Sequence, residues 1–113
     1  MDKYNNYKKS MVRIAINEAI KSNLLHKHGA VIVKNNKVIG KGHNIGYVEK
    51  IFEKWSIHAE IAALLKCHKK DLKGSTLIVI RISKNGSLIN SKPCNKCSNY
   101  ILKTGIKNVI YSK

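Results

Sequence analysis

"STLIVIRIS", residues 75 to 83, is a near-continuous apolar run, and it decides the fold class. A strand-length run without polar alternation is typical of a central strand that is buried on both faces of a sheet. Both faces are buried only when helices or other layers pack on each side. We therefore expect this run to form the middle of an α/β sheet.

The neighbouring segments predict the rest of that sheet. "GAVIVKNNKVIGKGHN", residues 29–44, holds two β-rich runs around an Asn pair. Asn tolerates positive φ, so we expect a hairpin with strands near 29–33 and 37–42. "KNGS", residues 84–87, predicts a turn, and "IKNVIYS", residues 106–112, predicts a last strand. The result is a mixed sheet of about four strands.

Helical patterns separate the expected strands. Apolar residues recur at helical spacing within residues 4–25, which predicts an amphipathic helix ending near 22–23. "SIHAEIAALLKCHKK", residues 56–70, predicts one long helix that begins at 56 or 57. "PCNKCSNYILKTG", residues 93–105, predicts a shorter helix with Pro93 at its first position and Gly105 as its stop. We interpret "YVEKIFEKW", residues 47–55, as a loop with room for one helical turn.

The order α-β-β-α-β-α-β predicts a three-layer α/β/α sandwich, formed by one domain over residues 1–113. The chain is 43% hydrophobic, which argues against disorder. It has no apolar run long enough to span a membrane, and "MDKYNNYKKS" is not a signal peptide, so we expect a cytoplasmic protein. Its three cysteines are an odd number, which argues against a disulfide framework.

The formal charge is +16, from 22 basic and 6 acidic residues. Such a balance favours an anionic partner, either a nucleotide or a nucleic acid. The lysines are scattered along the whole chain, so a solvated lysine surface that reflects coding bias is the other interpretation.

Two short clusters carry the chemistry: "HAE" with His58 and Glu60, and "PCNKC" with Cys94 and Cys97. Each cluster begins a predicted helix, and both helix N-termini can meet at one edge of the sheet. One His and two Cys supply three ligands, the number that a catalytic zinc site takes from protein before it adds water. A carboxylate at this position can accept a proton from that water and pass it to a leaving amine. A closed structural site with His43 or Cys67 as fourth ligand is the alternative.

The pair "HAE" and "PCNKC" resembles H-x-E…P-C-x-x-C, the signature of the zinc-dependent cytidine/deoxycytidylate deaminase superfamily. The N-terminal helix, the hairpin and the two motif helices follow the order of that family over most of the chain. The resemblance implies a cytidine deaminase-like fold with a Zn²⁺ cofactor. It also implies roles for single residues: zinc ligands His58, Cys94 and Cys97, general acid/base Glu60, a sugar contact from Asn44 and a base contact from the backbone N–H of Ala59.

Other candidate residues have weaker signals. His43 adjoins Asn44, which makes a substrate contact from His43 a further hypothesis. Trp55 either stacks on the base or belongs to the core. We expect Cys67 to be a small buried residue, and His26 and His28 to take surface or capping positions.

The chain departs from the resembled family in two places. It stops one strand after "PCNKC", whereas many relatives add a strand and helices; this weakens a tRNA deaminase assignment and leaves a sheet edge uncovered. We therefore expect a homodimer or a higher homo-oligomer. The stretch 83–92 is longer than usual and borders the expected pocket, with Lys92 where relatives often have Glu or Ser.

Three functions follow from these observations. The first is a zinc-dependent hydrolase that deaminates cytosine in a nucleoside or nucleotide and releases ammonia. The second is a deaminase acting on a base within nucleic acid, either tRNA adenosine or single-stranded cytosine. The third is a zinc-stabilised binding module without turnover. The intact Glu60 favours an enzyme over the third.

Overall fold

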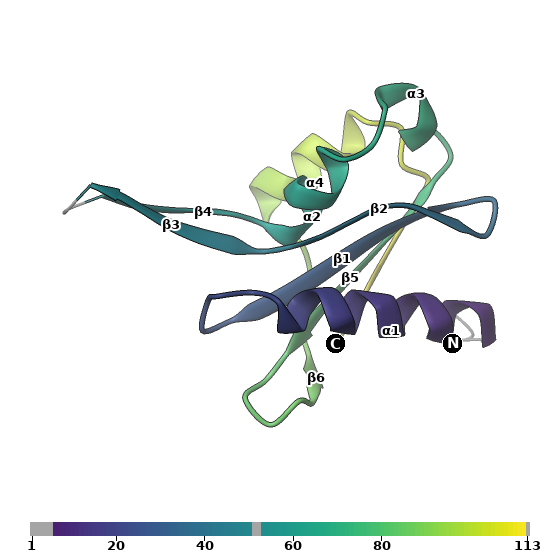
Figure 1. The fold of residues 1–113 in the computed structure, drawn as a ribbon. Helices are drawn as coiled ribbons and strands as arrows, with labels where there is room; N and C mark the ends of the chain where they lie inside the picture. Colours follow the sequence, from purple (N-terminus) through teal and green to yellow (C-terminus); the bar gives the residue numbers. More distant parts are fainter. Residues whose placement is uncertain (1–5, 51–52, 113) are drawn as a thin grey trace.

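The computed structural model describes residues 6–50 and 53–112 of the chain. Its main sheet is built around β5 (Thr76–Ile82), as Figure 1 shows. On one side β5 pairs antiparallel with β1 (Lys27–Lys34), which in turn pairs with β2 (Lys37–His43). Two short strands share the other edge of β5: β7 (Asn108–Tyr111) runs parallel to its first half, and β6 (Leu88–Ile89) runs antiparallel to its end. The sheet is therefore mixed, as expected, with five strands.

The β1–β2 hairpin confirms the turn expected from the Asn pair. Asn35 and Asn36 have φ values of 53° and 64°, and Lys34 pairs directly with Lys37. Two consecutive residues with positive φ define the type I′ turn, whose twist matches that of the flanking strands. Asn adopts this region at lower cost than most side chains.

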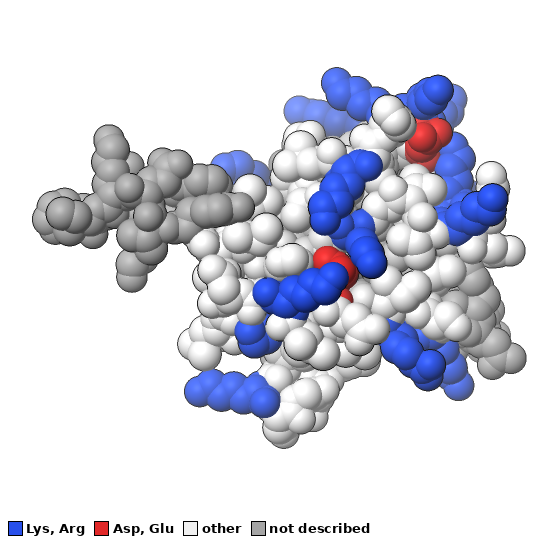
Figure 2. Space-filling model, in the orientation of Figure 1, with Lys and Arg blue, Asp and Glu red and all other residues white. Residues whose placement is uncertain are grey.

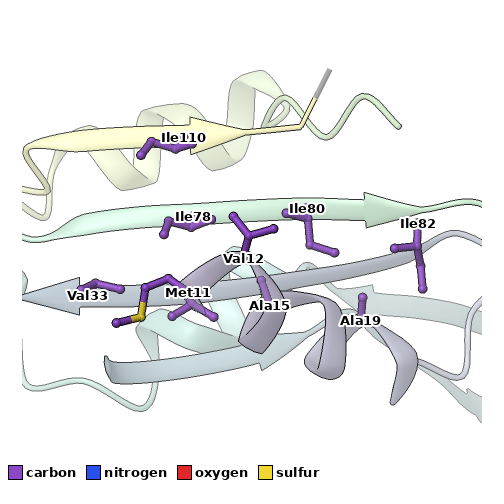
Figure 3. Close-up of a cluster of buried hydrophobic side chains, with 10 residues drawn as sticks. Met11, Val12, Ala15, Ala19, Val33, Ile78, Ile80, Ile82 and Ile110 are labelled. Atoms are coloured by element: carbon purple, nitrogen blue, oxygen red, sulfur yellow. The ribbon is translucent and has the colours of Figure 1, made fainter. Parts of the chain in front are cut away.

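One face of the sheet is covered by α1 (Asn6–Ile20), which lies across β1 and β5 (Figure 1). The helix approaches β1 closely, because a Cβ atom at Gly29 would lie 1.9 Å from the carbonyl oxygen of Ala15. Figure 3 shows this cluster of buried side chains, in which small helix residues face the branched residues of the strands. Its labelled members are Met11, Val12, Ala15, Ala19, Val33, Ile78, Ile80, Ile82 and Ile110.

The opposite face carries α2 (Ala59–Leu64), α3 (Lys69–Leu72) and α4 (Asn95–Leu102). Leu77 and Val79 of β5 are buried against this layer, while Ile78 and Ile80 are buried against α1. Burying each of these side chains stabilises the fold by roughly 1.5–3 kcal/mol. The central strand is thus buried on both faces, and the three-layer α/β/α sandwich is confirmed.

The loop expected over residues 47–55 is wrong. The structure has β3 (Ile45–Lys50) and β4 (Glu53–Ile57), an antiparallel pair that projects from the main body in Figure 1. Ile45 pairs with Ile57, and Tyr47 pairs with Trp55. Apolar residues alternate with other residues at these positions, which is the period of a strand. The charged residues between them obscured that pattern.

The single helix expected over residues 56–70 is also wrong. Because β4 continues to Ile57, α2 cannot begin before Ala59. At its other end the N–H groups of Lys66 and Cys67 donate to carbonyl oxygens three residues earlier, a 3₁₀ pattern that tightens and ends a helix. The chain turns, and α3 starts after His68, which is extended.

Lysine and arginine side chains are spread over separate parts of the face in Figure 2, and acidic side chains show at only two places. The visible positive charge therefore forms no single stripe on this face. Within the described residues, no helix combines the length and the hydrophobicity that a bilayer crossing requires.

Candidate active site

Three potential metal ligands meet where α2 and α4 begin. The ligand atoms of His58, Cys94 and Cys97 all lie within 4.8 Å of one another. His58 Nδ1 is 3.1 Å from Cys97 Sγ and 3.8 Å from Cys94 Sγ. Usual zinc bond lengths and tetrahedral angles place such nitrogen and sulfur atoms about 3.6 Å apart. The three side chains therefore fit a zinc ion, with a fourth position left for a non-protein ligand.

A closed four-ligand site has no support in the described part of the chain. Neither His43 nor Cys67 belongs to the cluster of potential ligands found there. The Cys67 thiol instead lies 3.4 Å from the carbonyl oxygen of Ile39 and 3.6 Å from that of Ala63. Cys67 is half-buried between α2 and β2, close to the packing role expected of it.

Two helix N-caps position the cluster. His58 is the N-cap of α2, and Cys94 is the N-cap of α4, where its sulfur accepts a hydrogen bond from the Cys97 N–H. Both helices pack on the same face of the sheet. Pro93 precedes the cap, so it does not occupy the first helical position expected from the sequence. The partial positive charge at both helix starts favours thiolate at this place.

Cys97 is the buried member of the cluster. Burial, with smaller contributions from the Glu60 carboxylate and from Cys94, raises the pKa of its thiol to about 12. A thiol with such a pKa stays protonated at neutral pH unless a cation takes the place of the proton. One imidazole and two sulfurs are a ligand set that suits zinc.

Glu60 lies in the same cavity as His58 and Cys94, and only 4% of its surface is exposed. His58 has extended backbone angles of φ −71° and ψ 151°, so the two side chains are not separated by the rotation of a regular helix. Burial raises the pKa of the Glu60 carboxyl above its usual value. A raised pKa favours the protonated form of a carboxyl group, which helps it to hold a proton between two transfers.

A cavity of about 370 Å³ opens beside this cluster. Two further residues expected at the site, Asn44 and Ala59, lie in its wall. The segment before β1, the start of β1 itself and the segment before Cys94 supply the remaining wall: Leu24, Leu25, His26, His28, Ser91 and Lys92.

Asn44 stabilises this wall through three hydrogen bonds. Its Oδ1 accepts a 2.8 Å hydrogen bond from the backbone N–H of His28, and its Nδ2 donates a 2.6 Å bond to the carbonyl oxygen of His26. Its own carbonyl oxygen accepts a 2.8 Å bond from the Ser22 hydroxyl. The buried amide thus fixes the segment that leads into β1.

His43, the neighbour of Asn44, faces the other way. A Cβ atom at Gly42 would lie 2.6 Å from the backbone nitrogen of Ala63, so Gly42 faces α2. Successive strand residues point to opposite faces, and His43 accordingly faces α1, with its Nδ1 3.2 Å from Glu18 Oε1. It does not line the cavity. This placement gives no support to the substrate contact expected of His43.

Glu18 is a buried carboxylate on α1, with 3% of its surface exposed. Its Oε2 accepts a 2.7 Å hydrogen bond from Lys21 Nζ. Burial alone would raise the pKa of Glu18, but the hydrogen bonds from Lys21 and His43 outweigh it and lower that pKa below the usual value. This ion-pair group lies on the α1 side of the sheet, apart from the cavity.

Ser91 ties the segment before Cys94 to the end of β7. Its hydroxyl donates a 2.8 Å hydrogen bond to the carbonyl oxygen of Val79, and its backbone N–H donates to the carbonyl oxygen of Ser112. The N–H of Ser112 returns a 2.8 Å bond to the Ser91 hydroxyl oxygen. These buried bonds hold the segment that carries Lys92 and Cys94 against the sheet.

Several wall residues were not expected from the sequence. His26 and His28, expected at surface or capping positions, both line the cavity. Arg81 on β5 hydrogen-bonds His26, and no sequence pattern indicated this, because the contact depends on how β1 and β5 align. Of the long stretch 83–92, only residues 91 and 92 are in the wall. The side chain of Trp55 lies outside the described part of the structure.

The fold and the site together define a zinc-dependent deaminase. A family model described as "Cytidine and deoxycytidylate deaminase zinc-binding region" matches residues 5–113. The chain is 34% identical over 110 residues to the deoxycytidylate deaminase of Mycobacterium phage D29, covering 77% of this chain and 78% of that protein. It is 38% identical over 90 residues to the diaminohydroxyphosphoribosylamino-pyrimidine deaminase of Buchnera aphidicola subsp. Schizaphis graminum (strain Sg), covering 74% of this chain and 49% of that protein.

Solved structures agree with the family match. The dCMP deaminase from the cyanophage S-TIM5, in apo form, superposes with a TM-score of 0.70 at 27% identity, covering 95% of this chain and 82% of that one. The same enzyme in complex with dCMP and dUMP gives a TM-score of 0.68 at 24% identity, covering 95% and 81%. The chain belongs to the cytidine and deoxycytidylate deaminase zinc-binding family, and the expected cytidine deaminase-like fold is confirmed.

Proposed function

We propose that the chain hydrolyses the amino group of cytosine in a nucleoside or nucleotide, giving uracil and ammonia. In this reaction, oxygen from water replaces the amine on the base, and the amine leaves after gaining a proton. The observation that carries the proposal is the position of the buried Glu60 carboxylate, in one cavity with His58 and Cys94.

In this proposal His58, Cys94 and Cys97 hold zinc. Zinc bound there would supply the Lewis acidity that makes water a nucleophile at neutral pH. Glu60 accepts the proton from the attacking water and delivers it to the leaving amine. The raised pKa of its carboxyl matches both transfers, since the group must hold the proton between them.

Two other wall residues would orient the substrate. Ala59 is the first residue of α2, and the N–H groups of a first helical turn have no partner within the helix. Its N–H is therefore available to the ring carbonyl of the base. Asn44 Nδ2 carries two hydrogens, of which the carbonyl oxygen of His26 takes one. The other makes a long 3.5 Å hydrogen bond with His28 Nδ1, and a sugar hydroxyl would replace that contact when the substrate binds.

A panel of substrates tests this proposal directly. Zinc-loaded protein would be incubated with cytidine, deoxycytidine, CMP, dCMP, a single-stranded oligonucleotide and tRNA, and ammonia release would be measured. We expect turnover of one or more of the free cytosine compounds. If none changes while zinc remains bound, the proposal fails and the interpretation as a binding module gains support. Turnover of the oligonucleotide or tRNA alone, with a steep salt dependence, would favour a nucleic-acid deaminase.

Glu60→Gln is the matching variant. It removes the proton carrier but keeps the shape of the side chain, so we expect retained folding and zinc content with turnover reduced about 100- to 10,000-fold. Glu18→Gln is the control, since Glu18 is the other carboxylate found buried among the described side chains and lies on the opposite face of the sheet. Undiminished turnover in Glu60→Gln would contradict the proposed role.

The Buchnera relative supports a second candidate. The 38% identity to an enzyme named for a diaminohydroxyphosphoribosylamino-pyrimidine favours deamination of such a pyrimidine, although the chain spans only 49% of that relative. Adding that compound to the panel separates the two candidates.

A further inference from the structure

Cys94 and Cys97 differ in their access to solvent. Cys94 is exposed at the N-cap of α4, whereas Cys97 is buried in the first turn of that helix. The Cys97 N–H donates a hydrogen bond to the Cys94 sulfur, so the two residues share one side of the helix start. A C-x-x-C pair at such a position serves disulfide oxidoreductases as well as metal sites. The pair therefore has a second chemistry open to it besides metal binding.

The two sulfurs are close enough to form a bond with each other. They belong to a group of ligand atoms that all lie within 4.8 Å of one another. Residues three apart in the first turn of a helix have Cα atoms about 5 Å apart, which is inside the range of roughly 4.4–6.8 Å that a disulfide spans. The cross-link therefore requires changes within a single helical turn.

Cys67 does not compete for this bond. Its thiol is half-buried, 3.4 Å from the carbonyl oxygen of Ile39, and it lies outside the group of ligand atoms. All three cysteines of the chain are among the described residues. Cys94 and Cys97 are therefore the one pair placed to cross-link within a chain.

A disulfide and a zinc ion exclude each other at this place. Zinc binds cysteine as the thiolate, and a sulfur that joins a disulfide is a thiolate no longer. Of the three potential ligands in the cluster, oxidation would leave His58 alone. The oxidised chain would therefore lose the zinc site, and reduction would restore it.

We propose that Cys94 and Cys97 form a reversible internal disulfide, so that the metal cluster is also a site of oxidative modification. The oxidant is a small anionic disulfide of the glutathione class. Lys92 and Lys96 are exposed and flank Cys94, and their positive charge favours the approach of such a reagent. This inference concerns the metal ligands alone, so it is independent of the substrate.

The exposed sulfur reacts first. The Cys94 thiolate attacks one sulfur of oxidised glutathione, whose S–S bond breaks as one glutathione thiolate leaves. The Cys97 sulfur then attacks Cys94 Sγ in this mixed disulfide, the Cys97 proton passes to solvent, and the second glutathione leaves as a thiolate. The chain has then lost two electrons and two thiol protons, and the two electrons reside on the two glutathione thiolates.

Intact mass and peptide mapping test the disulfide without an activity assay. The protein would be incubated with excess oxidised glutathione at a series of free zinc concentrations, alkylated and weighed. We expect a chain lighter by two hydrogen atoms, alkylated at Cys67 and cross-linked between Cys94 and Cys97. Zinc at about 10 times its Kd leaves about one chain in eleven without metal, so it should slow the cross-linking about 10-fold. Dithiothreitol followed by zinc should restore the original mass and zinc content.

Single-cysteine variants test the order of the two steps. Cys97→Ser should retain glutathione on Cys94 as a stable mixed disulfide, because the sulfur that displaces it is missing. Cys94→Ser should take up glutathione at least about 10-fold more slowly at Cys97, because the rate of exchange depends on access to the sulfur. Cys67→Ser is the matched control, which keeps both sulfurs and should cross-link as the wild type does.

Three results would overturn the inference. The first is a wild-type chain that accumulates glutathione on Cys94 and forms no internal cross-link. The second is a cross-link that joins Cys67 or a second chain in place of the expected pair. The third is a rate of cross-linking that does not change with zinc, which would show that the metal and the disulfide do not compete.

Discussion

Gly42→Ala is a sharp test of how the sheet positions the active site. Gly42 on β2 faces α2, and an added Cβ would lie 2.6 Å from the backbone nitrogen of Ala63 and 2.8 Å from the Cβ of Ala62. Ordinary contacts at such atoms are 3.4 Å or more. Since the obstructing atoms include backbone, the whole of α2 must move outward by about 1 Å, a shift typical of an overpacked core.

The displaced helix carries both His58 and Glu60, so the substitution should affect stability and chemistry together. Overpacking of this kind costs about 1–3 kcal/mol, which lowers the Tm by roughly 4–8 °C for each kcal/mol in a domain of this size. A misplacement of about 1 Å at catalytic groups can reduce the rate about 100-fold. Thermal unfolding, zinc content and kcat/KM of the zinc-loaded protein would be measured side by side.

Gly74→Ala is the matched control. Gly74 has a φ of 79° and no neighbouring atom within 4 Å of an added Cβ, so alanine there strains the backbone by roughly 1–2 kcal/mol without moving α2. We expect it to lower the Tm and leave kcat/KM unchanged. Full activity in Gly42→Ala, or an equal loss of activity in both variants, would refute the reasoning that α2 rests on the glycine and sets the site geometry.

Three further predictions concern pH, metal and assembly. The pKa of Glu18 is lowered in the folded protein, so the unfolded chain binds the proton first as the pH falls. The stability that Glu18 contributes is therefore complete above the ordinary pKa of 4.5 and is lost as the pH drops through the folded-state pKa. Urea unfolding between pH 3 and 7, about the titration range of a carboxyl group, should show this loss in wild type and not in Glu18→Gln. Chelation should lower the Tm, and added zinc should restore it. Zinc at 1,000 times its Kd should raise the free energy of unfolding by about 4 kcal/mol; an unchanged Tm would contradict a bound zinc ion. Exposed apolar residues on the helical layer, Leu65 at 68% and Leu102 at 78%, favour self-association; sedimentation that shows only monomer at micromolar concentration would contradict the expected homo-oligomer.

The elements that were predicted correctly are determined by interactions between residues close together in the sequence. The buried run of β5 and the Asn35–Asn36 turn depend on periodicity and on backbone preference within a few residues. The failures have a common source. The charged residues of β3 and β4 hid the strand period, and α2 is shortened because β4 occupies its expected first turn.

Some features of the candidate site could likewise be predicted from the sequence, and others could not. "HAE" and "PCNKC" each begin a helix, so the meeting of His58 with the two cysteines followed from the order of elements. The position of His43 was also available from the sequence: Gly40 and Gly42 are two residues apart on one strand face, which leaves His43 on the other. Arg81 could not be found, because its contact depends on the register between β1 and β5.

The bonds between Ser91 and Ser112 bear on the order of events during synthesis. A chain leaves the ribosome from its N-terminal end at about 5–20 residues per second, so Ser112 emerges after both cysteines. A nascent chain that already displays His58, Cys94 and Cys97 still lacks the last strand that secures the loop between them. A chain truncated before β7 would lack these bonds, so the segment that carries Cys94 would lose its attachment to the sheet at Ser112.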